Sequence, residues 1–137
     1  MKSESRDVNK EHKYNVDLPS KRSVRPWGVV MLLVRNRKCS VDWTTVNPGG
    51  ITSLHSHNIR DELWVMLDDG AEVVLGERII HPKIGDEILM KTSVKHRLIN
   101  NTNHPIRMIV VCFGEWKEED QIRHEDAYGR EGQPVKL

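Results

Sequence analysis

The 137-residue sequence predicts an all-β domain, and three observations support this prediction. Short apolar runs with period-two alternation follow one another through most of the chain. Glycine, proline, asparagine and aspartate separate these runs, and no stretch shows the period of an amphipathic helix. Many short strands of this kind are typical of a β-sandwich or a β-barrel, and the length suits one such domain.

Each predicted strand ends at a turn signal. In chain order the strands span residues 29–34, 38–46, 51–57, 62–67, 71–75, 78–80, 87–91, 96–100 and 106–113. The turns at 47–50 and 68–70 read Asn-Pro-Gly-Gly and Asp-Asp-Gly, which supply the backbone conformations that tight turns require. Residues 115–132 are highly charged, so we expect a short helix or an irregular lid over one end of the barrel there.

Composition divides the chain into three regions. Residues 1–22 are polar, with scattered apolar positions, and form either a flexible tail or an arm that packs on a second subunit. Residues 23–130 form the barrel together with its charged C-terminal segment. Residues 131–137 form a short C-terminal tail.

Charge and apolar runs limit the classes of partner. Lysine and arginine total 21 against 20 acidic residues, so the net charge of +1 gives no field that would steer the protein to nucleic acid or a membrane surface. The longest apolar run, 29–34, is far below the ~20 residues of a membrane span, and the polar N-terminus lacks the apolar stretch of a signal peptide. We expect a cytoplasmic protein with a small-molecule partner. Cys39 and Cys112 are expected to be reduced, buried thiols.

Four residues are the candidate metal ligands. His55 and His57 are two apart on a predicted strand, so both imidazoles leave the same face. Glu62 follows after a gap long enough for a turn, and His96 begins another strand. Three imidazoles and a carboxylate suit one divalent ion, with zinc the first candidate and iron, manganese, nickel or cobalt as alternatives. A metal would also compensate the desolvation of these groups inside an apolar barrel.

The other histidines and the tryptophans have ordinary explanations. His12, His81, His104 and His124 lie in charged or turn contexts and are expected to be polar residues without a metal. Trp43 and Trp64 fall within alternating strands and are expected to pack in the barrel.

The spacing around the four ligands resembles the two signature motifs of the cupin superfamily. The matching positions are Gly49, His55, His57, Glu62 and Gly70 in the first motif, and Gly85, His96 and Asn100 in the second. The resemblance implies a single-domain cupin β-barrel, a double-stranded β-helix of the jelly-roll type. The chain departs from the second motif at Lys91 and Ser93, where a proline and a glycine are usual.

Five further stretches resemble one cupin family, the cupin domain of type II mannose-6-phosphate isomerases. They are residues 25–28, 46–50, 60–65, 96–100 and 114–130, and the resemblance covers about 23–130. In those isomerases a glutamine usually stands at the position of His55, so this chain carries an imidazole in place of a neutral amide. The resemblance implies metal-dependent interconversion of an aldose phosphate and a ketose phosphate, with mannose 6-phosphate as the model substrate.

This resemblance also implies roles for residues outside the ligand set. Arg130, Lys95 and Glu125 are the candidate catalytic residues, Arg130 as the foremost substrate contact and the other two as possible bases, with Asp126 as a further possible base. Arg25, Trp27 and Arg97 are the candidate substrate-binding residues.

Two other functions and a quaternary state stay open at this stage. An iron-loaded cupin with three histidines and one glutamate can activate oxygen, so a dioxygenase is one alternative. A non-enzymatic cupin that binds a small molecule is the other. Cupins of this size usually bury a barrel face or exchange an N-terminal strand, which implies a homodimer.

Overall fold

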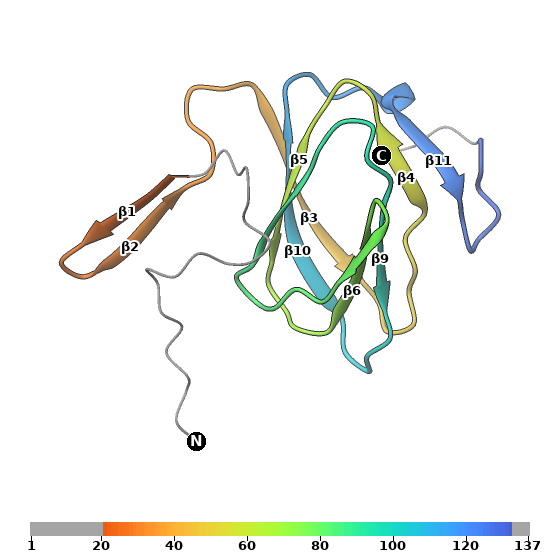
Figure 1. The fold of residues 1–137 in the computed structure, drawn as a ribbon, viewed down its shortest axis with the longest axis horizontal. Helices are drawn as coiled ribbons and strands as arrows, with labels where there is room; N and C mark the ends of the chain where they lie inside the picture. The colour runs from red at the N-terminus through yellow and green to blue at the C-terminus, as the bar shows by residue number, and fades with distance from the viewer. Residues whose placement is uncertain (1–20, 133–137) are drawn as a thin grey trace.

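The computed structural model describes residues 21–132 of the chain, which form eleven strands and one turn of 3₁₀ helix (Figure 1). The strands are β1 (Lys21–Arg25), β2 (Gly28–Leu32), β3 (Cys39–Val46), β4 (Leu54–His57), β5 (Glu62–Met66), β6 (Ala71–Leu75), β7 (Arg78–Ile80), β8 (Glu87–Met90), β9 (His96–Asn100), β10 (Ile106–Phe113) and β11 (Gln121–Glu125). The 3₁₀ turn, Glu118–Asp120, directly precedes β11. The all-β prediction is confirmed.

Two antiparallel sheets form the barrel. The first has the strand order β3-β10-β5-β8, and the second has the order β11-β4-β9-β6-β7. Alternation along the strands directs apolar side chains from both sheets into one shared core. Met66, Val73, Leu98 and Ile106 are completely buried there.

The turn between β5 and β6 follows the predicted chemistry. Gly70 has a φ of +99°, and a Cβ added to it would lie 2.6 Å from Thr102 Cγ2. Glycine is therefore required at this position by both the backbone conformation and the space available.

Two strands were not predicted. β1 forms a two-stranded hairpin with β2, and the predicted strand 29–34 is observed as β2. β11 lies in the charged segment, where we expected a helix or an irregular lid, and it pairs with β4. Each of these strands has one apolar residue, Val24 and Ile122, so hydrophobic alternation could not reveal them.

The tryptophans divide between core and surface. Trp64 is buried in the core as expected. The expectation for Trp43 was wrong, because its side chain is 62% exposed on the outer face of β3. β3 is the last strand of its sheet in the described residues, and its odd-numbered positions face outward. Within residues 21–132 there is no helix of the length and apolarity needed to cross a membrane.

Candidate metal centre

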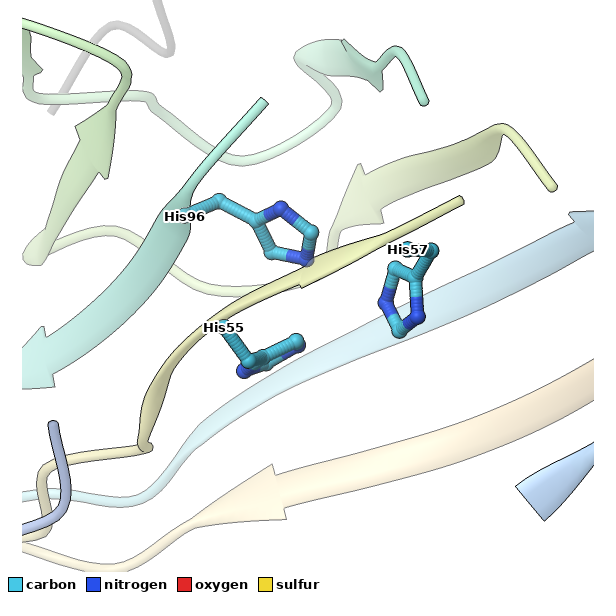
Figure 2. A group of neighbouring side chains, drawn as sticks. All are labelled: His55, His57 and His96. Atoms are coloured by element: carbon cyan, nitrogen blue, oxygen red, sulfur yellow. The ribbon is translucent and has the colours of Figure 1, made fainter. Parts of the chain in front are cut away.

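The three candidate ligand histidines, two from the first motif and one from the second, lie on neighbouring strands. His55 and His57 lie on β4, and His55 pairs directly with His96 on β9. Residues opposite each other on paired strands direct their side chains to the same face. The three imidazoles therefore share the inner face of the second sheet, and Figure 2 shows them grouped around one space.

The distances among the imidazoles suit a common ion. The ring centroids are 5.1 Å apart for His55 and His57, 4.3 Å for His55 and His96, and 5.2 Å for His57 and His96. One potential ligand nitrogen from each ring lies within 4.8 Å of those of the other two. This arrangement brings the three predicted histidines together and excludes His81, His104 and His124.

Backbone carbonyls fix two of the rings. His55 Nδ1 lies 2.9 Å from Ser53 O, and His96 Nδ1 lies 3.0 Å from Val94 O. A carbonyl only accepts, so each Nδ1 carries the proton and each Nε2 retains its lone pair. Hydrogen bonds of this kind are typical of metal-ligating histidines, because they set both the tautomer and the ring orientation.

Glu62 completes the predicted set from the opposite sheet. Its Oε1 lies 3.3 Å from His57 Nε2. Four buried atoms of this cluster lack hydrogen-bond partners in the described structure: His57 Nδ1, His57 Nε2, His96 Nε2 and Glu62 Oε2. Buried polar atoms without partners are costly, and a divalent cation would satisfy several at once. The residues present therefore fit a metal ion.

The pKa values of the cluster favour ligand-ready forms. Burial, followed by the neighbouring imidazoles His96 and His57, lowers the pKa of His55 to about 3. Burial is also the main cause that lowers the pKa of His96 to about 4. Burial alone would raise the pKa of Glu62, but the His57 imidazole beside its Oε1 outweighs burial and lowers that pKa to about 2. The neutral imidazoles of His55 and His96 and the ionised carboxylate of Glu62 are forms that bind metals.

Neighbouring loops hold the candidate ligands in place. Asp120 accepts hydrogen bonds from the backbone N–H groups of Asn58 and Ile59 at 2.8 and 3.0 Å, which fixes the loop between His57 and Glu62. Asp61 accepts a hydrogen bond from the N–H of Thr92 at 2.8 Å. The N–H of Ser93 donates to His57 O at 2.6 Å. The turn before β9 is therefore tied to both ligand-bearing segments.

A cavity of about 210 Å³ adjoins the ligands and contains two residues that the sequence reasoning missed. Arg60 is 3% exposed, its Nη1 donates to Lys117 O at 3.2 Å, and its guanidinium lies over the ring of Trp116. Asp42 reaches the same cavity from β3. The signal for Arg60 was its position two residues before a predicted ligand. We call this space the inner cavity.

A second cavity, of about 360 Å³, continues outward from the first. Both cavities are lined by Thr44, Thr52, His55 and Gln121. The second cavity also contains Arg123, Tyr128 and Arg130 among its lining residues. We call it the outer cavity.

The structure places the remaining predicted residues in different regions. Arg25 and Trp27 lie at the tip of the β1–β2 hairpin, and the Trp27 side chain is 74% exposed. Lys95 is exposed in the turn before β9. None of these three is among the residues that line the two cavities.

Arg97 and Glu125 lie on the outer face of the second sheet. Arg97 Nε donates to Thr52 O at 2.9 Å, and its Nη1 lies 3.6 Å from Glu125 Oε2. The Glu125 side chain is 68% exposed. Arg130 is the one member of the predicted substrate-binding and catalytic sets that lines either cavity.

The cysteines are free, as expected, although Cys39 is only partly buried. Cys112 lies beside Glu62 in the sheet register and lines the inner cavity. Burial, followed by the charge of Glu62, raises the pKa of its thiol to about 12. Cys112 is therefore a neutral thiol across the physiological range.

Comparison with known proteins agrees with this geometry. The family model described as "Mannose-6-phosphate isomerase C-terminal" matches residues 10–126. The xanthan biosynthesis protein XanB of Xanthomonas campestris pv. campestris is 36% identical over 107 residues, which are 77% of this chain and 23% of XanB. The alginate biosynthesis protein AlgA of Pseudomonas putida is 33% identical over 112 residues, which are 81% of this chain and 23% of AlgA. The chain thus spans about a quarter of the length of these relatives.

A solved structure supports the fold. The crystal structure of a cupin 2 conserved barrel domain protein from Salinispora arenicola has a TM-score of 0.53 and 20% sequence identity. The match covers 83% of this chain and 89% of that one. The predicted cupin fold is confirmed by this likeness.

Proposed function

Because the chain belongs to the family of mannose-6-phosphate isomerase C-terminal domains, we propose that it is a metal-dependent aldose–ketose isomerase acting on a sugar phosphate. The observation that supports this most directly is the convergence of three imidazoles within 4.8 Å at a cavity that a small molecule can enter. The first substrate to test is mannose 6-phosphate, with fructose 6-phosphate as its product.

The proposed ligands are His55, His57, Glu62 and His96, and zinc is the first candidate ion. A divalent ion held there would supply Lewis acidity, which would polarise a carbonyl group of the substrate. This chain carries a histidine at residue 55, and the Nδ1 contact with Ser53 O leaves His55 Nε2 available for the ion.

Two residues of the inner cavity are proposed to assist. The guanidinium of Arg60 places a permanent positive charge beside the reacting oxygens, where developing negative charge is stabilised in a site of low dielectric. The carboxylate of Asp42 is proposed as the base that moves a proton between adjacent carbons. We prefer Asp42 to Lys95 and Glu125 as the base because it lines the cavity beside the ligands.

The decisive experiment is elemental analysis of the purified protein followed by an assay of mannose 6-phosphate and fructose 6-phosphate. We expect about one divalent ion per chain and interconversion that stops after chelation and returns with the metal. Oxygen consumption that depends on iron, without turnover of either sugar phosphate, would instead identify a dioxygenase. A tightly bound small molecule without turnover across a panel of sugar phosphates would identify a binding module.

Ligand variants make the metal assignment specific. His57→Ala and His96→Ala should each lose the bound ion and the activity. His81→Ala is the matched control, because His81 is exposed and lies outside the cluster. Equal retention of metal in all three variants would contradict the ligand assignment.

We also propose that the protein is a homodimer. The β1–β2 hairpin stands away from the barrel in Figure 1 and carries exposed Val24, Trp27 and Val30 side chains. A two-stranded hairpin alone is marginally stable in water, so a second copy would stabilise it by covering these side chains. Light scattering at micromolar concentration should give the mass of two chains. A monomer under these conditions would contradict the proposal.

A further inference from the structure

The strand at the centre of the first sheet gives the inner cavity an apolar wall. β10 lies between β3 and β5, and its residues Met108, Val110 and Cys112 all line the inner cavity. These positions are two apart, so their side chains leave the inward face of the strand together. All three side chains are buried. We call them the β10 strip.

The strip runs from the apolar core to the candidate ligands. In the sheet register, Cys112 lies opposite Glu62, and Val110 lies opposite Trp64 on one side and Asp42 on the other. The indole of Trp64 widens the apolar surface at Val110, and its ring meets the ring of His96 edge to face, with 5.6 Å between the centroids. Apolar surface therefore lies directly beside the histidine cluster.

The opposite side of the inner cavity is polar. The second sheet and the segment before β4 contribute His55, Gln121 and Thr52 to its lining. The inner faces of the two sheets are opposed across the barrel. A small molecule whose oxygens lie at the histidine cluster therefore presents its other side to the β10 strip.

The outer cavity has no comparable apolar wall. The residues that line it and do not line the inner cavity are mostly polar, and they include the hydroxyl and amide side chains of Thr45, Asn47, Ser53 and Tyr128. Hydroxyl groups of a ligand can thus find hydrogen-bond partners in the outer cavity. The polarity of the lining changes between the two cavities, and the β10 strip causes this change.

The strip restricts the chemistry of the ligand edge that faces it. Valine has no hydrogen-bonding atom, and the sulfur atoms of methionine and of a neutral cysteine bond only weakly. A ligand hydroxyl against the strip would lose its hydrogen bonds to water without replacement, whereas a CH₂ group there loses none and gains from burial. The inner cavity therefore favours a ligand with metal-binding oxygens on one edge and hydrocarbon on the other.

We propose that the β10 strip determines substrate specificity, and that the preferred substrate is a deoxy sugar phosphate with a CH₂ group at the carbon that faces the strip. The identity of the substrate as a sugar phosphate rests on the proposed function, whereas the preference for hydrocarbon rests on the lining of the inner cavity. Aldose–ketose isomerisation changes C1 and C2 and leaves C3 and C4 as they are. The 3-deoxy and 4-deoxy analogues of mannose 6-phosphate are therefore the substrates to compare.

The test is isothermal titration calorimetry of the full-length protein as purified, with mannose 6-phosphate and these two analogues as probes. One analogue should bind at least about tenfold more tightly than mannose 6-phosphate, because it leaves no hydroxyl without a partner at the strip. The proposal is wrong if mannose 6-phosphate binds as tightly as both analogues. This comparison uses wild-type protein, so its outcome does not depend on whether a variant folds.

A change of polarity at the centre of the strip should reduce this preference. Val110→Thr nearly conserves volume and adds a hydroxyl that can bond to the substrate, so the tenfold preference should fall to about threefold or less. The matched control is Val111→Thr, because Val111 is also buried but packs against Leu63 and Phe113 in the other apolar cluster. The control should keep the wild-type preference, although it buries the same added hydroxyl.

A second variant separates polarity from space. Val110→Ala enlarges the inner cavity without adding a polar group, so it should keep the preference for the deoxy analogue. The same loss of preference in Val110→Thr and Val110→Ala would show that space at residue 110 decides the affinity, and the proposal would be wrong.

Failure of the isomerase proposal would look different. In that case a deoxy analogue would still bind more tightly than mannose 6-phosphate, with the same dependence on residue 110, but no ketose phosphate would form from any of the three probes. Conversely, conversion of mannose 6-phosphate to fructose 6-phosphate with a KM no higher than that of either analogue would support the isomerase and overturn the role of the strip.

Discussion

At one end of the barrel the inward-facing strand positions hold the histidine cluster and Glu62, and at the other end they hold apolar side chains. We call these the ligand end and the core end. On β5, Glu62 and Met66 both face inward, one at the histidine cluster and the other in the apolar core. On β9, His96 and Leu98 are related in the same way. Strand alternation therefore orients ligand and core residues equally well, and only the residue type distinguishes the ends.

This difference has an energetic consequence. At the core end, buried side chains are apolar and gain from leaving water. At the ligand end, buried imidazole and carboxylate atoms lack hydrogen-bond partners in the described residues. Without an ion this end lowers the stability of the fold, so the two ends should respond oppositely to truncation and to metal.

The largest expected effect is at the core end. Leu98→Ala should lower the free energy of unfolding by about 2–5 kcal/mol, because Leu98 is completely buried and its removal leaves a cavity. Urea unfolding with and without added zinc measures this loss. The additional stability given by zinc should remain, since the ligands are intact.

His96→Ala is the matched variant at the ligand end. It should remove the zinc-dependent stabilisation and cost less in the metal-free protein, because the loss of the Nδ1 hydrogen bond to Val94 O is offset by removal of a buried Nε2 that has no hydrogen-bond partner in the described residues. Equal losses for both metal-free variants, with zinc still stabilising both, would show that the two ends do not differ in this way.

A polar network at the core end of β9 should have the next largest effect. Asn100 is fully buried, and its Nδ2 donates to Val46 O at 3.0 Å and to His104 O at 2.8 Å. Asn100→Ala should lower the free energy of unfolding by about 1–3 kcal/mol, because buried carbonyls lose their donor. The control is Asn101→Ala, at an exposed position, with an expected change within about 0.5 kcal/mol by urea unfolding. Similar losses in both variants would argue against a special role for the network.

The sequence was informative where residue type and alternation agree. Glu62 and His96 could be predicted because spacing and strand period place them on inward-facing positions. Arg60 and Asp42 were missed because a charged residue at a strand end or on an edge strand is most often solvent-exposed. Only the folded structure shows that both line the inner cavity.

Segments with few apolar residues limited the rest of the prediction. β11 has no hydrophobic alternation, because its inward-facing positions, Gln121 and Arg123, line the cavities. Polar residues that line a cavity therefore concealed this strand from hydrophobic alternation. For the same reason, Arg97 and Glu125 could not be placed on the outer face until the register of β9 and β11 was known.

Two acid–arginine pairs at different positions should share one pH dependence. The hydrogen bond from Arg130 is the main cause that lowers the pKa of Asp126 from 3.8 to about 2, and Arg107 does the same for Asp68. A lowered folded-state pKa gives stability that is present above the ordinary pKa and is lost as the pH falls through the folded-state value. Asp126→Asn and Asp68→Asn should therefore each cost at most about 1 kcal/mol at pH 6, and this cost should disappear as the pH falls below about 2.

Thermal unfolding between these pH values measures the effect. Only Asp126→Asn should also weaken binding of mannose 6-phosphate, since only Asp126 orients an arginine of the outer cavity. Weaker binding of mannose 6-phosphate in both variants would show that the loss of affinity does not depend on whether the acid–arginine pair lies at the outer cavity.

The smallest expected effect is a gain in stability at the ligand end. Ser93 has a φ of +67°, a left-handed conformation that favours glycine, and its N–H donates to His57 O at 2.6 Å. Ser93→Gly should therefore raise the free energy of unfolding by about 0.5–1 kcal/mol in urea, with the metal content unchanged. Ser93→Ala is the control, because alanine retains a Cβ and should give no gain. Equal stability of the two variants would place the effect in the serine hydroxyl and not in the backbone, and the turn would then hold His57 without strain.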